Sequence, residues 1–192
     1  MENEPPPLSF AQKTQQLVNF LKFICMTFSA PVEVWLRRGF GDRYFSKAAL
    51  FSVVLIPFWG TLFPGTDLTL LFGFWWSYFI MLLFARIAMF RRWTRGEVEH
   101  TLYSGYSRLH RFFPRASELK IKETIEPMLV FIIGVVFLTM SPALGLYLMV
   151  ASFAMAVSIR ITMIETRQRL LQLTDAAFEQ RELAEAFRRV FP

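Results

Sequence analysis

Two long stretches without charge constrain this chain more than any other feature of its sequence. Residues 48–85 contain one charged side chain, Asp67, and residues 128–159 contain none. Such stretches are typical of helices that cross a bilayer, because lipid offers the backbone no hydrogen-bonding partner outside the helix. The composition agrees: 54% of the 192 residues are hydrophobic and only 19% are charged, whereas soluble domains are about 25% charged. The sequence therefore predicts an all-α integral membrane protein.

Turn-forming residues divide each stretch into two helices. Pro64 and Gly65 stand just before Asp67, and Pro142 follows Ser141 near the middle of the second stretch. Proline presets φ and glycine permits a left-handed backbone, so both places predict tight turns. We expect four transmembrane helices in two hairpins, over residues 48–63, 68–85, 128–140 and 143–159.

These predicted helices are short for full crossings. They contain 13 to 18 residues each, whereas a full crossing of the bilayer needs about 20. Long basic side chains at their ends can reach the headgroups and extend the crossing. A second hairpin that enters the bilayer only as a shallow wedge is the alternative that the lengths leave open.

The basic residues predict the orientation of the hairpins. Six of the 21 Lys and Arg residues lie in residues 1–47, nine in 86–127 and six in 160–192, so neither hairpin turn contains any. Cytoplasmic segments of membrane proteins collect Lys and Arg. We therefore expect both termini and the middle loop in the cytoplasm, with the hairpins in a bacterial inner membrane. The acidic start of the chain lacks the basic segment of a secretory signal, so none is expected.

The N-terminal segment, residues 1–47, carries an amphipathic pattern. Ser9 and Gln12 have the spacing of a capping box, and Leu17, Leu21, Ile24 and Phe28 follow at helical intervals. The pattern predicts a helix that lies in the membrane interface or packs on the hairpins. We expect this helix to end at Ala30-Pro31, because proline disrupts a helix interior.

Basic and aromatic residues alternate before the first hairpin and in the loop of residues 86–127. Such a loop can bind anionic lipid headgroups, a nucleotide phosphate or nucleic acid. We favour lipid over nucleic acid, since positive charge in a hydrophobic chain most often marks the cytoplasmic side of a membrane. The candidate headgroup contacts are Arg37, Arg38, Arg91, Arg92, Arg95, Arg108 and Arg111.

The C-terminal segment, residues 160–192, predicts one long amphipathic helix in the cytoplasm. Leu170, Leu173, Phe187 and Phe191 fall on one apolar stripe with Ala177 and Ala184, and Gln180 interrupts it. These four large side chains are the candidate partner-binding residues. The stripe suits a coiled-coil seam with a second copy or with another protein. It equally suits packing on the middle loop of the same chain.

The sequence contains no recognisable catalytic or metal-binding pattern. Neither hairpin interior holds an ionisable residue, and His100 and His110 lie ten residues apart with no cysteine nearby. We therefore expect no enzyme activity, no cofactor and no metal site. The leading hypothesis is an accessory or assembly subunit of a membrane complex, of the secretion, conjugation or exclusion type. A small oligomeric channel or transporter, or a membrane-shaping hairpin protein, is the alternative.

Overall fold

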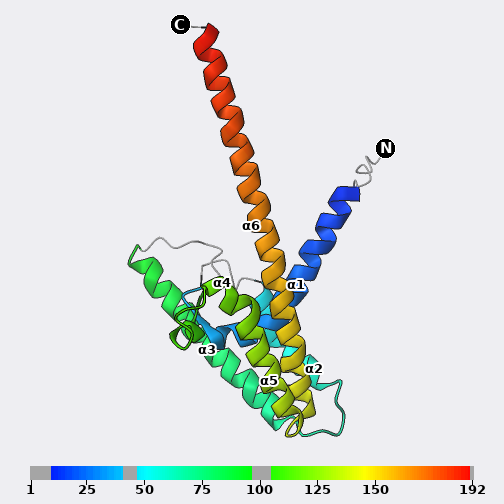
Figure 1. Ribbon diagram of the computed structural model, residues 1–192. Helices are drawn as coiled ribbons and strands as arrows, with labels where there is room; N and C mark the ends of the chain where they lie inside the picture. Colours follow the sequence, from blue (N-terminus) through cyan, green and yellow to red (C-terminus); the bar gives the residue numbers. More distant parts are fainter. Residues whose placement is uncertain (1–9, 41–46, 97–104, 191–192) are drawn as a thin grey trace, which may run out of the picture. The chain divides into compact units, whose positions relative to one another are not determined.

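The computed structural model describes residues 10–40, 47–96 and 105–190, and this structure is mostly helical, at 83% (Figure 1). The chain forms two compact units, one up to Ser158 and one from Ile159 onward. Among the described residues, three helices are long and apolar enough to cross a membrane, within Gln12–Leu36, Thr69–Thr94 and Pro142–Glu185. The long helices are α1 (Phe10–Leu36), α2 (Ala48–Gly60), α3 (Thr69–Thr94), α5 (Glu126–Leu138) and α6 (Pro142–Val190).

The two turns fall where the sequence predicts them. Residues 61–68 separate α2 from α3, and residues 139–141 separate α5 from α6. At the first turn Gly65 has a φ of +82°, the left-handed conformation that a glycine adopts without strain. The helix lengths differ from expectation. Helix α2 has 13 residues, which is about 20 Å at 1.5 Å per residue and short of the roughly 30 Å hydrocarbon core.

Helix α1 corrects the predicted end of the N-terminal helix. It continues through Pro31 to Leu36. A proline inside a helix removes one backbone hydrogen bond, but packing against neighbouring helices can compensate for this loss. Pro31 is completely buried, and α1 packs against α2 and α3. Contacts with α2 and α3 therefore stabilise the helix beyond Pro31, although the local preference of proline is to end a helix.

The two halves of α1 differ sharply in burial. Leu17 and Phe20 in the first half are 67% and 61% exposed, whereas Cys25, Val32 and Val34 in the second half are buried. The second half is thus part of the core of the first unit, which agrees with packing on the hairpins. By length and composition α1 is also a candidate membrane span, a role that the sequence reasoning gave only to the hairpin helices.

Aromatic rings join four helices in this core. The ring of Tyr147 on α6 lies about 6 Å from those of Phe28 on α1, Trp59 on α2 and Phe74 on α3. The Tyr147 hydroxyl donates to the Phe28 carbonyl at 3.3 Å. Tyr147 is fully buried, so this one side chain connects α6 to α1, α2 and α3.

Side-chain hydrogen bonds tie α2 to α3. The Trp75 indole N–H donates to the carbonyl of Val53 at 2.8 Å. That carbonyl would normally accept from residue 57, but Pro57 has no N–H to give. On the same pair of helices the buried Tyr78 hydroxyl donates to the Ala49 carbonyl at 3.0 Å and lies 3.1 Å from Ser52 Oγ. These two helices therefore satisfy each other's polar groups in an apolar setting.

Helices α5 and α6 approach each other closely at two glycines. A Cβ on Gly145 would lie 2.6 Å from the backbone nitrogen of Leu138 and 2.8 Å from the Gly134 carbonyl oxygen. A Cβ on Gly134 would lie 3.0 Å from Met149. Small residues at such a crossing are typical of helix pairs in membranes.

Helix α5 is entered through a continuous helical segment. The short helix α4 (Glu118–Lys120) leads into a π-helical turn η2 (Ile121–Ile125), and α5 follows without a break. The π turn ends two residues before Pro127, whose ring would clash with a carbonyl one regular turn earlier, and the wider turn relieves that clash. Helical residues therefore run over 118–138, beginning well before the predicted position 128.

The middle loop has a small ordered element of its own. Strand β1 (Arg37–Arg38) pairs antiparallel with β2 (Tyr106–Ser107), which leads into the 3₁₀ turn η1 (Arg108–Arg111). Gly105 has a φ of +79°, and a Cβ there would lie 3.0 Å from the Arg38 carbonyl oxygen. Glycine is thus required where the loop meets the end of α1.

Candidate functional site

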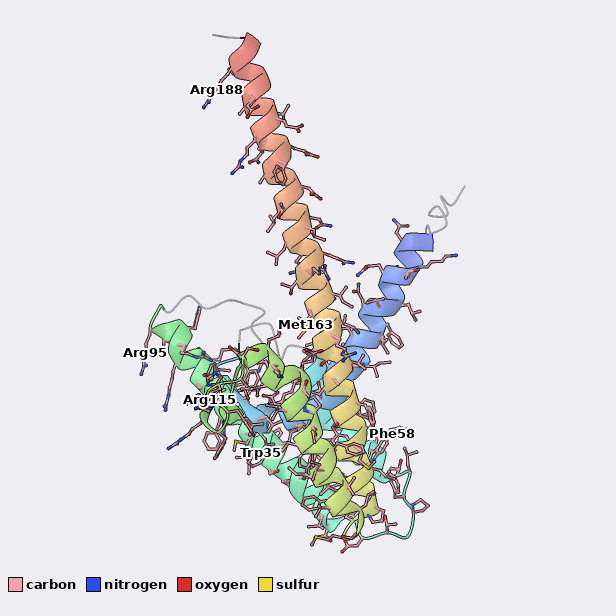
Figure 2. The ribbon with its side chains drawn as sticks, in the orientation of Figure 1. Trp35, Phe58, Arg95, Arg115, Met163 and Arg188 are labelled. Carbon is pink, nitrogen blue, oxygen red and sulfur yellow. The ribbon has the colours of Figure 1, made fainter. Side chains whose placement is uncertain are left out.

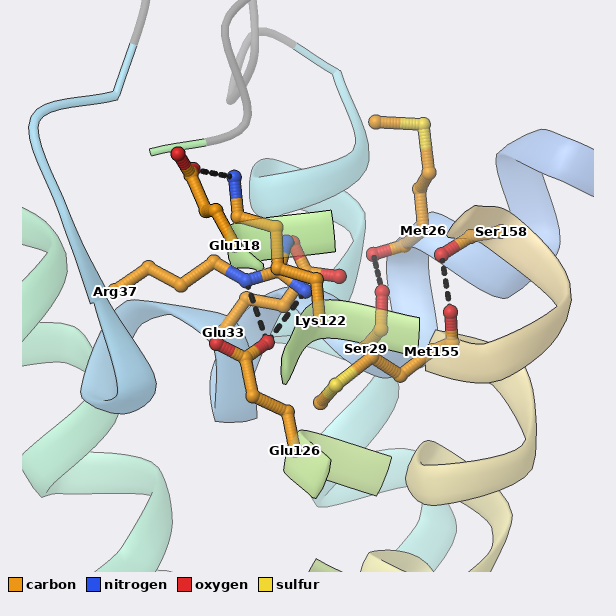
Figure 3. A network of polar contacts seen from close by, with 9 residues as sticks. All are labelled: Met26, Ser29, Glu33, Arg37, Glu118, Lys122, Glu126, Met155 and Ser158. Atoms are coloured by element: carbon orange, nitrogen blue, oxygen red, sulfur yellow. Dashed lines mark hydrogen bonds and ion pairs between the residues drawn. The ribbon is translucent and has the colours of Figure 1, made fainter. Parts of the chain in front are cut away.

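Three charged residues form a cluster in the core of the first unit (Figure 3). The Arg37 guanidinium donates from Nε to Glu126 Oε2 at 2.8 Å, and its Nη2 lies 2.7 Å from the same oxygen. Its Nη1 lies 3.3 Å from Glu33 Oε2, one turn back in the chain. All three side chains are at most 1% exposed. We call Glu33, Arg37 and Glu126 the buried ionic cluster.

A second ion pair lies beside this cluster in Figure 3. Lys122 Nζ lies 2.6 Å from Glu118 Oε1, and the Lys122 side chain is only 8% exposed. Both residues stand on the helical segment that carries Glu126, so only about two helical turns separate these charges along the chain. The region therefore concentrates ionised groups in a protein whose other buried side chains are mainly apolar.

Strand pairing positions the arginine of the cluster. Arg37 stands opposite Ser107 in the β1–β2 pair. Ser107 is itself buried, and its hydroxyl accepts from the Leu109 N–H at 3.2 Å, which caps η1. The end of α1 is thereby fixed against both the middle loop and the start of α5.

The cluster contains two carboxylates and one guanidinium. An isolated buried charge is costly, and a close partner with good hydrogen-bond geometry offsets that cost. Arg37 gives both carboxylates such a partner. Glu126 Oε1 is also buried and, within the described part of the chain, accepts no hydrogen bond. The arrangement can therefore join α1 to α5, and it also places a carboxylate oxygen inside the helical core.

This cluster corrects one predicted headgroup contact. Arg37 is 1% exposed and bound to carboxylates inside the protein, so the expectation that it faces lipid headgroups is wrong. The physical reason is that Glu126, 89 residues away in sequence, provides its partner. The sequence did contain one signal that Arg37 is paired inside the protein. Glu33 stands four residues before it in an otherwise apolar run.

The other predicted headgroup residues lie nearer the surface. Arg38 is exposed, with its guanidinium carbon 5.9 Å from the centre of the Tyr106 ring. Arg92 is half-buried and donates from Nη2 to the Phe40 carbonyl at 3.2 Å. The remaining members of the set are exposed: Arg91, Arg95, Arg108 and Arg111.

The predicted partner-binding stripe lies on the second unit, where α6 is helical to Val190. Leu170, Leu173 and Phe187 are 59%, 68% and 65% exposed. Figure 2 shows side chains along this part of α6, with Arg188 near its end. Phe191, the fourth predicted residue, lies outside the described residues. Large apolar side chains are therefore accessible over at least four helical turns.

An apolar groove of about 580 Å³ opens on the first unit. Its walls come from the end of α1, from α3 and from the α5–α6 hairpin, and include Trp35, Gly73, Phe74, Leu129 and Leu144. Thr69 and Ser77 contribute the few polar atoms. The groove therefore suits a hydrocarbon chain and offers little to a polar substrate.

Groups of three or more metal-ligating side chains that could hold an ion are absent from the residues that the structure describes. His100 lies outside those residues, and the ring of His110 lies 5.4 Å from that of Tyr106. Comparison of the chain with known protein families, with curated proteins and with solved structures gives no match. The site is therefore interpreted from its own residues.

Proposed function

We propose that this chain is a non-enzymatic integral membrane protein that serves as an accessory or assembly subunit of a membrane complex. The observation that carries the proposal is the exposed apolar stripe on α6, because soluble surfaces rarely leave such side chains uncovered in a row. Three apolar helices long enough to span a bilayer support the membrane part. The partners we propose are a protein of the complex or a second copy, and anionic lipid at the exposed arginines.

The proposed setting is a bacterial inner membrane, with both termini cytoplasmic and the hairpin turns on the other side. The absence of Lys and Arg from both turns supports this orientation. Secretion, conjugation and exclusion systems are the kinds of complex in which we place the subunit. In that arrangement the C-terminal helix would meet its partner in the cytoplasm.

Partner recovery from the native membrane tests this function. The Leu170→Ala/Leu173→Ala variant and the control Gln168→Ala/Gln172→Ala would be purified in mild detergent. Burial of each leucine contributes roughly 1.5–3 kcal/mol, so the affinity of the leucine variant for its partner should fall by orders of magnitude and the partner should no longer co-purify. The glutamine control should retain it. Equal recovery from both variants, with both inserted in the membrane, would contradict the proposal.

One observation favours a second candidate, a small oligomeric channel or transporter. Ionisable side chains inside a membrane protein often mark a pathway for ions or protons, and Glu33 and Glu126 are such side chains in the core. Reconstituted liposomes would distinguish the two functions. A transporter should show ion flux that survives truncation after Arg169 and falls in the Glu126→Gln variant, whereas an accessory subunit should show no flux.

A further inference from the structure

The charges beside the apolar stripe follow the seven-residue pattern of a coiled coil. With Leu170 at position a and Leu173 at position d, the seam continues through Ala177, Gln180, Ala184 and Phe187. The helix is uninterrupted over this whole stretch. Gln180 places one polar side chain in the seam, which is a common device for fixing the register of a coiled coil.

The flanks of this seam carry only positive charge. Arg167, Arg181 and Arg188 occupy e positions, and Arg169 occupies a g position. All four side chains are exposed. The other e and g positions from 162 to 190 hold uncharged residues, namely Thr162, Thr174, Ala176, Leu183 and Val190. We call these four arginines the basic flank.

The acidic residues of the segment all lie away from the seam. They occupy the outward b, c and f positions of the heptad: Glu165, Asp175, Glu179, Glu182 and Glu185. Charges at e and g meet the partner helix, whereas charges at the outer positions face solvent. The segment is nearly neutral in total. Its flank is positive because of where the charged residues stand in the heptad, and not because basic residues are in excess.

A second copy of the chain is a poor match for this flank. In a parallel pair each g position meets the e position of the next heptad, which gives Ala176 with Arg181 and Leu183 with Arg188 and no ion pair. In an antiparallel pair e meets e, which brings arginines together. Self-pairing therefore gains no flanking ion pair in either orientation.

An anionic membrane surface is also a poor match. A helix that lies on anionic lipid carries Lys and Arg over its polar face. Here the polar face opposite the seam carries the five acidic residues. Anionic headgroups would meet the basic flank on one side of the helix but would lie close to those carboxylates on the other.

We infer that the C-terminal part of α6 pairs with an acidic amphipathic helix of a different protein, whose Glu or Asp residues meet Arg167, Arg169, Arg181 and Arg188. This inference rests on the proposed function and specifies the chemistry of the partner. The apolar seam supplies most of the affinity, and the basic flank supplies the selection between partners.

Two designed peptides test the charge of the partner. Each has 28 residues with Leu at every a and d position; one carries Glu and the other Lys at every e and g position. The full chain would be held in phosphatidylcholine nanodiscs, and peptide binding followed by fluorescence anisotropy. Four exposed ion pairs predict a preference of roughly tenfold or more for the Glu peptide at low salt. The preference should shrink in 1 M salt, where the Debye length is about 3 Å.

Charge reversal provides the matched variants. Arg167→Glu/Arg181→Glu/Arg188→Glu should reverse the preference in favour of the Lys peptide. The control, Glu165→Arg/Glu179→Arg/Glu182→Arg, changes the outer face. If the peptide contacts the e and g positions, this control should change the preference for the Glu peptide over the Lys peptide by no more than about twofold. If binding depends only on the total charge of the helix, the control should bind the Glu peptide markedly more tightly. Helical content measured by circular dichroism should be the same in all three proteins.

Three results would overturn the inference. One is equal binding of the two peptides. Another is self-association of the unmodified chain that Leu170→Ala/Leu173→Ala abolishes and the charge reversal leaves unchanged. The third is a blue shift of a fluorophore attached in the Leu173→Cys variant when phosphatidylglycerol is added to the nanodiscs without peptide. If the leucine variant still loses its native partner in any of these cases, the proposed function stands and only the acidic partner is refuted.

Discussion

At the scale of single residues, the most consequential feature is a positive charge held between two carboxylates in the protein core. Arg37 in β1 contacts Glu33 near the end of α1 and Glu126 on α5, with all three side chains inaccessible to solvent. A buried pair need not add net stability, but removing one member leaves an uncompensated charge. The cluster therefore makes the end of α1 sensitive to any single neutral substitution.

The Arg37→Leu substitution tests this sensitivity. It leaves Glu33 and Glu126 buried without their cation, and we expect a loss of about 3–5 kcal/mol in the free energy of unfolding. Adding Glu126→Gln should recover part of the loss, because one carboxylate is then neutral. Unfolding in detergent micelles measures both effects. The control is Arg38→Leu, which changes an exposed arginine; equal stability of the Arg37 and Arg38 variants would contradict the prediction.

A second residue-scale prediction concerns the carbonyl that Pro57 leaves without a donor. Trp75→Phe removes the indole N–H that reaches Val53 oxygen at 2.8 Å, and an unsatisfied carbonyl costs about 1–3 kcal/mol. In a Pro57→Ala background, residue 57 regains an N–H that can donate to the same oxygen. The cost of Trp75→Phe should therefore be smaller there. A double-mutant cycle in micelles measures this difference, and an identical cost in both backgrounds would contradict the hydrogen-bond interpretation.

At the scale of helices, close approach between α5 and α6 depends on glycine. A Cβ on Gly145 would overlap backbone atoms of α5, and a Cβ on Gly134 would be in tight contact with α6 at 3.0–3.1 Å. Close packing of this kind is the usual source of helix association in lipid, where the hydrophobic effect between helices is absent. Gly73 on α3 is different, since a Cβ there would meet nothing within 4 Å.

These glycines give a matched pair of substitutions. Gly145→Ala would place a methyl group against backbone atoms of α5 that cannot move aside singly, and we expect about 1–3 kcal/mol of destabilisation. Gly73→Ala should be neutral or slightly stabilising, since alanine favours a helix more than glycine does. Thermal unfolding of both variants in the same detergent compares them. A Gly145→Ala protein as stable as the Gly73→Ala protein would show that the helices separate more easily than their packing indicates.

At the scale of the whole molecule, the question is which segments face which side of the membrane. The proposed orientation puts both hairpin turns on one side and the basic middle loop on the other. Thr66 and Met140 are exposed residues in the two turns, and Arg115 is an exposed residue of the loop. Their accessibility to a membrane-impermeant thiol reagent therefore reports the orientation directly.

Single-cysteine variants test the orientation. In a Cys25→Ala background, Thr66→Cys and Met140→Cys should react with the reagent from outside the cell, and Arg115→Cys only after the membrane is opened. The buried position of Cys25 makes its replacement by a small apolar residue suitable. A Met140→Cys variant that reacts from neither side would identify the second hairpin as a wedge inside the bilayer. Reaction of Arg115→Cys from outside would refute the orientation itself.

The sequence by itself determined the helical class of this protein and the places where its hairpins turn. Both depend on signals that are local in the chain: long apolar runs require helices in lipid, and Pro and Gly mark turns. The long helix from residue 160 onward and its apolar stripe also follow from local signals, because a 3.6-residue period fixes which side chains share a face. The exposure of Leu170 and Leu173 is known from the structure alone.

Only the tertiary structure decided where α1 ends and that Arg37 is buried. Pro31 and Arg37 have strong local preferences, one for ending a helix and one for water. The overriding contacts come from α2 and α3 for Pro31 and from Glu126, 89 residues away, for Arg37. Because packing and ion pairing act through space, residues distant in the chain set the environment of these two side chains.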